Sequence, residues 1–93
     1  MSDLLARQID GITALVTGAN RGLGKAFTQA LLDRGAAKVY AGARDPGAVE
    51  VSDARIVPVR LDITDPSDVA AAARDCTDVS LLINNAGDRK SVV

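Results

Sequence analysis

The feature that most constrains this chain is a glycine-rich segment that lies between an apolar run and an amphipathic run. Residues 17–24 read TGANRGLG, the apolar run covers 12–16, and the amphipathic run covers 27–32. This order is typical of a strand, a tight turn and a helix. Such a turn directs backbone N–H groups and the positive end of a helix dipole toward one point, which favours a bound pyrophosphate.

Each glycine of the segment has a steric role in this interpretation. Gly18 allows the tight turn, Gly22 lets the backbone approach a ligand, and Gly24 lets the helix pack close to the strand. The spacing G-x-x-x-G-x-G is weak by itself, because glycine-rich turns are common. Between a strand and a helix it indicates a phosphate site, and the alternative is a tight turn that binds nothing.

The rest of the chain alternates between predicted strands and predicted helices. Strands are expected at 12–17, 38–42, 55–61 and 79–83, with helices at 23–34 and from Pro66 onward. Residues 48–54 are expected to hold one or two helical turns. This alternation predicts an α/β fold with a parallel sheet and helices on both faces. Pro58 removes a backbone donor from the third strand, which favours an edge position.

Apolar periodicity predicts which faces are buried. The first helix is expected to bury Leu23, Ala26, Phe27, Ala30 and Leu31, and the second to bury Val69, Ala72, Ala73 and Cys76. The fourth strand is apolar throughout and is expected to be buried.

Composition narrows the classes of function. The chain has 93 residues, 47% of them apolar, which allows one small domain with a packed core. A net charge of −1 gives no reason to expect nucleic acid or a membrane as a partner. The chain has one cysteine and no histidine, which excludes an intrachain disulfide, a cysteine metal cluster and imidazole chemistry. The lone cysteine is consistent with the cytoplasm, which is the expected location.

Three motifs resemble those of the short-chain dehydrogenase/reductase family. The glycine-rich segment matches T-G-x-x-x-G-x-G, residues 84–87 read N-N-A-G after the fourth strand, and Asp62 follows the third strand. The resemblance covers roughly residues 10–87. It implies a Rossmann-type sheet of four strands in the order 3-2-1-4, which binds NAD(P) across the carboxyl ends of its strands.

The resemblance also implies which residues contact the dinucleotide. The glycine-rich segment is expected to line the pyrophosphate and adenosine through Gly18, Asn20, Gly22, Leu23 and Gly24. The adenine is expected to meet Asp62 and Ile63, and the cofactor ribose to lie beside Asn84, Ala86 and Gly87. An alternative role for Asp62 is capping of the turn at 62–65.

The end of the second strand bears on the choice of cofactor. An acid there, about 20 residues past the glycines, holds the ribose hydroxyls of NAD and repels a 2′-phosphate. This chain has a small neutral residue at that point, followed by Arg44, and Arg21 of the glycine-rich segment is expected to reach the same space. Two guanidinium groups suit a phosphate. The sequence therefore predicts NADP(H), with NAD(H) as the alternative. The alternative is that both arginines are solvated surface charges and that Asp45 neutralises Arg44.

The catalytic residues of the family have no counterpart here. The family uses a Tyr with a Lys four residues later and a Ser upstream, whereas Tyr40 is followed at that distance by Arg44. Tyr40 is therefore interpreted as a packing residue, and no residue is assigned a catalytic role. The leading interpretation is the NADP(H)-binding half of an oxidoreductase that moves a hydride between NADPH and a carbonyl or alcohol. The alternatives are a non-catalytic nucleotide-binding module and a truncated product without function.

The last residues do not continue the pattern. Residues 88–93 carry no periodicity and form an atypical tail, and residues 1–93 are expected to form a single incomplete domain. The abrupt change at Asp88 is interpreted as a truncation, a frameshift or a sequence-assembly join, and the alternative is a protein that is short by design. In the strand order 3-2-1-4 the fourth strand lies at an open apolar edge. An edge of this kind favours pairing with another chain, so self-association is expected.

Overall fold

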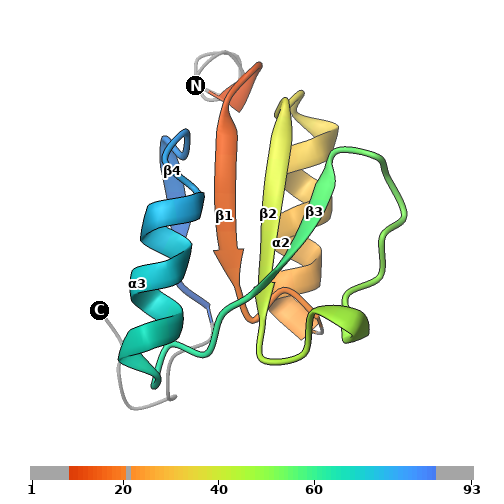
Figure 1. The fold of residues 1–93 in the computed structure, drawn as a ribbon. Helices are drawn as coiled ribbons and strands as arrows, with labels where there is room; N and C mark the ends of the chain where they lie inside the picture. The colour runs from red at the N-terminus through yellow and green to blue at the C-terminus, as the bar shows by residue number, and fades with distance from the viewer. Residues whose placement is uncertain (1–8, 21, 86–93) are drawn as a thin grey trace.

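The computed structural model describes residues 9–20 and 22–85 and contains one parallel sheet of four strands (Figure 1). The strands are β1 (Thr13–Thr17), β2 (Lys38–Ala43), β3 (Ile56–Arg60) and β4 (Leu81–Ile83). Their order across the sheet is β3-β2-β1-β4, and every pairing is parallel. The predicted Rossmann-type fold and strand order are confirmed, including the edge position of Pro58 in β3.

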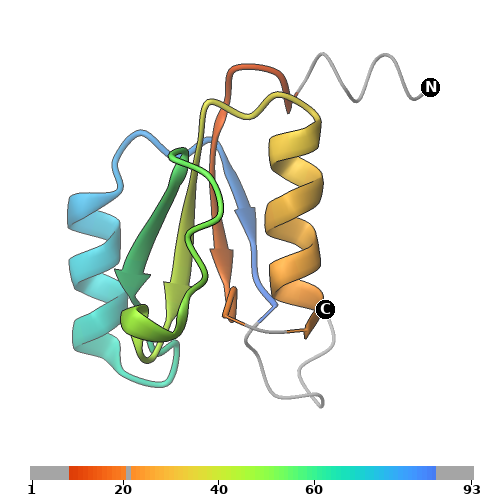
Figure 2. The same ribbon diagram turned by 90° about the vertical axis from the view of Figure 1, so that its right-hand side faces the viewer.

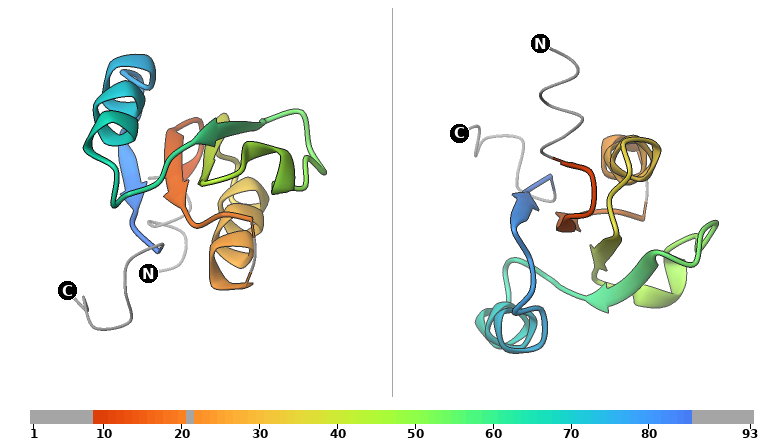
Figure 3. Two further views of the ribbon diagram at one scale, coloured as in Figure 1. Left: turned by 60° about the horizontal axis from the view of Figure 1, so that its bottom comes forward. Right: turned by 90° about the horizontal axis from the view of Figure 1, so that it is seen from above.

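Two helices cover opposite faces of the sheet, as the alternation predicts. The helical elements are α2 (Gly22–Asp33), the short 3₁₀ helix η1 (Pro46–Ala48) and α3 (Pro66–Asp75). Figures 2 and 3 show α2 on one side of the strands and α3 on the other. No helix in the described part of the chain has both the length and the apolar character that crossing a membrane requires.

The hydrophobic core lies between the sheet and α2. Ala14 and Val16 of β1 and Val39 and Ala41 of β2 are fully buried, and Leu31 and Leu32 of α2 pack in the same cluster. Small aliphatic side chains fill this space, which lets the helix approach the two central strands closely.

Both predicted helix faces are partly wrong. Leu23 is 62% exposed, and the buried positions of α2 are Gly24, Thr28, Leu31 and Leu32. Leu23 is not part of the core cluster, which α2 joins through Leu31 and Leu32. Ala72 of α3 and the C-cap residue Cys76 are buried, whereas Val69 is 44% exposed and Ala73 is exposed.

Two further expectations are corrected. The fourth strand is short and only partly buried, because it forms the edge of the sheet and Leu82 is left 59% exposed. The helical turn expected within 48–54 begins earlier, at Pro46. The Asp45 side chain starts it by accepting a hydrogen bond from the Gly47 N–H at 3.0 Å.

A side chain at the start of β3 joins this strand to the C-terminal end of α2. Arg55 donates through Nη1 to the carbonyl oxygens of Leu32 and Ala36 at 3.2 and 3.3 Å. It also binds both carboxylate oxygens of Asp53, at 3.0 Å from Nε and 2.8 Å from Nη2. The side-chain and backbone hydrogen bonds from Arg55 lower the pKa of Asp53 to about 2.

This clamp makes stability depend on pH in a defined range. An unfolded Asp has a pKa of about 3.9, so the lowered folded pKa of Asp53 stabilises the fold above that value. The contribution is lost as the pH falls toward about 2. We expect the urea midpoint of the unmodified chain to fall more between pH 4 and pH 2 than that of Asp53→Asn. Asp75→Asn, which removes an exposed carboxylate outside the clamp, is the control, and equal pH dependence of Asp53→Asn and the unmodified chain would contradict the clamp.

Candidate nucleotide-binding site

A cavity of about 640 Å³ lies at the carboxyl ends of the strands. Parallel strands bring these ends to one edge of the sheet, where open α/β folds bind their ligands. Four segments that are distant in sequence form its walls: the glycine-rich turn, the end of β2, the segment after β3 and the segment after β4. The lining residues are Gly18, Asn20, Gly22, Leu23, Ala43, Arg44, Asp45, Leu61, Asp62, Ile63, Thr64 and Asn85.

Most of the predicted site residues meet in this cavity. The lining includes Gly18, Asn20, Gly22, Leu23, Arg44, Asp62 and Ile63. Gly24 lies beneath the turn, and Asn84 lies beside the cavity, where its neighbour Asn85 forms part of the lining. Arg21, Ala86 and Gly87 lie outside the described residues.

The glycine-rich turn has the backbone geometry that the spacing predicts. Gly18 and Gly22 have φ angles of 63° and 57°, in the left-handed region that side chains disfavour. A Cβ at Gly24 would overlap the carbonyl oxygen of Gly18 and come within 2.8 Å of Asn85 Nδ2. The Ala19 N–H donates to the Gly42 carbonyl at 3.0 Å, which anchors the turn to β2. The N-terminus of α2 therefore opens directly onto the cavity.

Thr17 connects the end of β1 to the segment after β4. Its buried hydroxyl donates to Asn84 Oδ1 at 3.0 Å and accepts from the Asn85 N–H at 2.8 Å. These bonds fix the position of Asn85 in the cavity wall. The sequence motif included Thr17 but gave it no role. The strand order is the signal that could have indicated a role for Thr17, because in this order β4 is the neighbour of β1.

Asp62 both caps its own turn and lines the cavity. Its Oδ1 accepts hydrogen bonds from the Thr64 backbone N–H at 2.9 Å and from the Thr64 hydroxyl at 2.6 Å. These bonds lower the pKa of Asp62, and the charges of Arg44 and Arg60 act in the same direction. The carboxylate is therefore charged at neutral pH. The capping interpretation is confirmed, and it does not compete with a place in the cavity.

The end of β2 presents no acid at position 43 itself, and the two residues that follow it in the cavity lining are Arg44 and Asp45. Ala43 stands where an acid is expected and is buried, and Arg44 follows it as an exposed lining residue. Asp45 uses its carboxylate for the Gly47 N–H, and within 9–20 and 22–85 no ion pair joins it to Arg44. Within these described residues, Asp45 therefore does not neutralise Arg44 through a direct ion pair.

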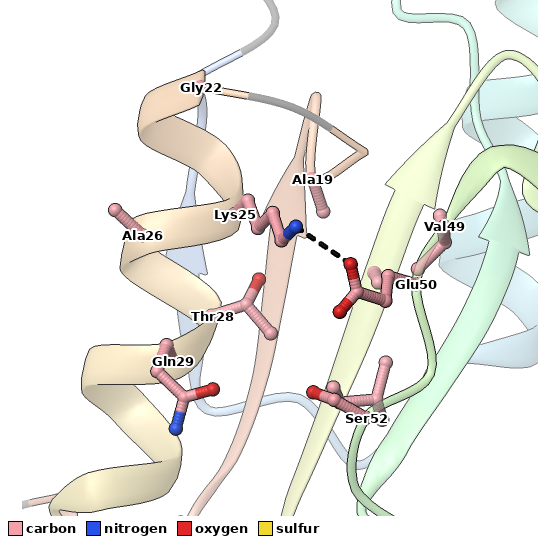
Figure 4. A pocket seen from close by; sticks show the side chains of 11 residues that line it. Ala19, Gly22, Lys25, Ala26, Thr28, Gln29, Val49, Glu50 and Ser52 are labelled. Atoms are coloured by element: carbon pink, nitrogen blue, oxygen red, sulfur yellow. Dashed lines mark hydrogen bonds and ion pairs between the residues drawn. The ribbon is translucent and has the colours of Figure 1, made fainter.

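A second cavity of about 420 Å³ lies between α2 and the segment that joins η1 to β3 (Figure 4). Lys25 and Glu50 face each other across it, with Nζ and Oε2 2.8 Å apart. The buried Thr28 hydroxyl donates to the Gly24 carbonyl at 3.0 Å. Its charged and buried polar groups are thus already paired, and Gly22 is the one predicted site residue in its wall. The cavity at the strand ends is the better candidate.

A comparison with protein families identifies the class. A family model described as short chain dehydrogenase matches residues 12–93. The chain belongs to the short chain dehydrogenase family.

Individual relatives agree with this class. The chain is 36% identical over 91 residues to the short chain dehydrogenase tazN of Aspergillus terreus, a match that spans 85% of this chain and 20% of that protein. It is 35% identical over 85 residues to the 3-oxoacyl-[acyl-carrier-protein] reductase FabG of Salmonella typhimurium, spanning 84% of this chain and 35% of that protein.

Solved structures show the same arrangement of elements. A short chain dehydrogenase from Burkholderia cenocepacia in complex with NADP matches with a TM-score of 0.81 and 53% identity, over 85% of this chain and 33% of that one. The NADPH-bound carbonyl reductase from chicken fatty liver matches with a TM-score of 0.74 and 34% identity, over 90% and 40%. The chain thus spans well under half the length of these relatives.

The glycine-rich turn predicts a difference between two matched substitutions. Gly24→Ala places a methyl group against the Gly18 carbonyl, whereas Gly22→Ala adds one in open space and costs only the left-handed φ. We expect Gly22→Ala to lower the free energy of unfolding by about 1–2 kcal/mol and Gly24→Ala by about 3 kcal/mol or more. Urea denaturation measures both. A Gly24→Ala variant at least as stable as Gly22→Ala would contradict the close packing at this turn.

Proposed function

We propose that the cavity at the strand ends binds NADP(H), and that this chain is the cofactor-binding part of an oxidoreductase. The whole enzyme would move a hydride between NADPH and a carbonyl or alcohol. The observation that carries the proposal is that one cavity unites the glycine-rich turn, Arg44 and Asp62. The NADP held by the relative from Burkholderia cenocepacia supports the same cofactor.

The donor and acceptor groups around the cavity fit a dinucleotide. The pyrophosphate would lie at Gly18 and Gly22, where left-handed glycines and the N-terminus of α2 leave room for phosphate oxygens. The charged carboxylate of Asp62 is an acceptor for an amino group such as that of adenine. Asn20, Leu23 and Ile63 would complete the walls.

A bound dinucleotide would supply or accept the hydride, and the residues around the cavity would bind and orient it. Asn84, together with Ala86 and Gly87, is proposed to flank the cofactor ribose.

The charge at the end of β2 favours a 2′-phosphate. A buried Ala43 neither accepts hydrogen bonds from ribose hydroxyls nor repels an anion, and Arg44 places a cation beside it. A guanidinium is a strong donor to phosphate oxygens. We propose that Arg44 contacts the 2′-phosphate and that Arg21 contributes a second guanidinium.

Calorimetric titration of the purified chain with NADPH and NADH tests this proposal. We expect NADPH to bind more tightly, and Arg44→Gln to weaken NADPH binding about tenfold or more, because a hydrogen bond to a charged group is lost. NADH binding should be unchanged. Arg74→Gln, an exposed arginine of α3, is the control. Equal binding of NADPH and NADH by the unmodified chain would overturn the preference for NADP(H).

We also propose that the chain associates with itself through β4. The two edges of the sheet differ, since β3 carries Pro58 and Arg60, which discourage pairing with another strand. The three residues of β4 are Leu81, Leu82 and Ile83, without charge or proline. With Leu82 59% exposed, this edge has both open backbone groups and apolar side chains to offer.

Sedimentation velocity tests this association. The average mass of the unmodified chain should rise with concentration, and Leu82→Lys should keep the chain closer to a monomer because a charge opposes strand pairing. Val51→Lys is a matched control, since Val51 is 55% exposed and lies outside the sheet. A monomer of unchanging mass in the unmodified chain would refute the proposal.

A further inference from the structure

We propose that Asp68 is a positioning residue for the adenosine side of the cavity, an inference that rests on the proposed nucleotide site. Asp68 lies in the first turn of α3 and does not line the cavity. Its Oδ2 accepts a hydrogen bond from the backbone N–H of Asp62 at 3.1 Å. The Asp68 side chain is only 14% exposed, so this carboxylate is directed toward the protein and not toward solvent.

The bond to Asp68 differs from the other bonds that hold Asp62. The Asp62 carbonyl accepts from the Asp65 N–H at 2.9 Å, and its Oδ1 accepts from Thr64. Thr64 belongs to the same turn and moves with it, and Asp65 is the N-cap residue at the junction between this turn and α3. Asp68 lies within α3, so its side chain fixes the Asp62 backbone to the body of the helix. The direction of the Asp62 carboxylate in the cavity therefore depends on a residue six positions further on.

Arg60 extends this connection to the other wall of the cavity. Its Nε lies 3.5 Å from Asp68 Oδ2, and its Nη1 donates to the backbone carbonyl of Arg44 at 3.3 Å. The Arg60 side chain is 66% exposed, so the ion pair itself contributes little stability. The ion pair instead affects the geometry of the cavity, because Asp68 and Arg60 together join the segment after β3 to the segment after β2. These two segments carry the groups proposed to meet the adenine and the 2′-phosphate.

Titration with 2′,5′-ADP, the adenosine half of NADP, tests the role of Asp68. Asp68→Ala removes the acceptor and should weaken binding about tenfold. Asp68→Asn keeps a side-chain oxygen for the Asp62 N–H and should restore most of the affinity. Ser67→Ala, in the same exposed helix turn, is the control and should bind as the unmodified chain does. If Asp68→Ala is unfolded, Asp68→Ser, whose hydroxyl is too short to reach, takes its place.

Hydrogen exchange at the Asp62 amide separates positioning from a general loss of stability. We expect Asp68→Ala to expose this amide selectively, with amides of the β1 and β2 core protected as before. Asp68→Ala that binds 2′,5′-ADP as tightly as the unmodified chain would overturn the role of Asp68. An unmodified chain that binds no 2′,5′-ADP would instead contradict the proposed nucleotide site, so the two failures are distinguishable.

Discussion

The structure depends on how closely the first turn of α2 approaches the end of β1. Any side chain at position 24 would meet the Gly18 carbonyl, so only glycine permits this contact. Because of this approach, α2 covers the face of β1 and β2 on which the small aliphatic side chains of these strands are buried. The approach also aims the helix N-terminus at the edge of the sheet. Packing of the core and formation of the candidate site are thus consequences of the same local geometry.

The parallel sheet turns this local geometry into a cavity. Gly18, Arg44, Asp62 and Asn85 follow β1, β2, β3 and β4 respectively, and each is carried to the same edge by its strand. Hydrogen bonds across this edge hold the segments in place. Thr17 joins the ends of β1 and β4, and Asp68 and Arg60 join the segments after β3 and β2. The candidate site is therefore a property of the sheet edge and not of the glycine-rich turn alone.

The sequence allowed prediction of the features that depend on local chemistry. Gly18, Gly22 and Gly24 lie where their spacing requires a turn, and α3 begins at Pro66 as expected. The strand order follows from the resemblance to the family. The cavity lining at Arg44 and Asp62 follows from the same order, because residues after parallel strands meet at one edge.

Features that depend on tertiary placement were not predictable in this way. Leu23 fits an apolar helix stripe, yet it lines the cavity at the strand ends and is largely exposed. Leu82 fits a buried strand, yet β4 is an edge. The bond from the Asp62 N–H to Asp68 leaves no trace in the sequence, since an acid in the first turn of a helix is common for electrostatic reasons.

The proposed nucleotide site requires an NADP(H) molecule to occupy the cavity at the strand ends. Backbone amide NMR during titration with NADPH tests it most directly, because it reports where binding occurs without requiring catalysis. We expect the largest shifts at the cavity residues Gly18, Gly22, Arg44, Asp62 and Ile63, with little change at Lys25 and Glu50 around the second cavity. Shifts centred on Lys25 and Glu50, or no shifts at saturating NADPH, would contradict it.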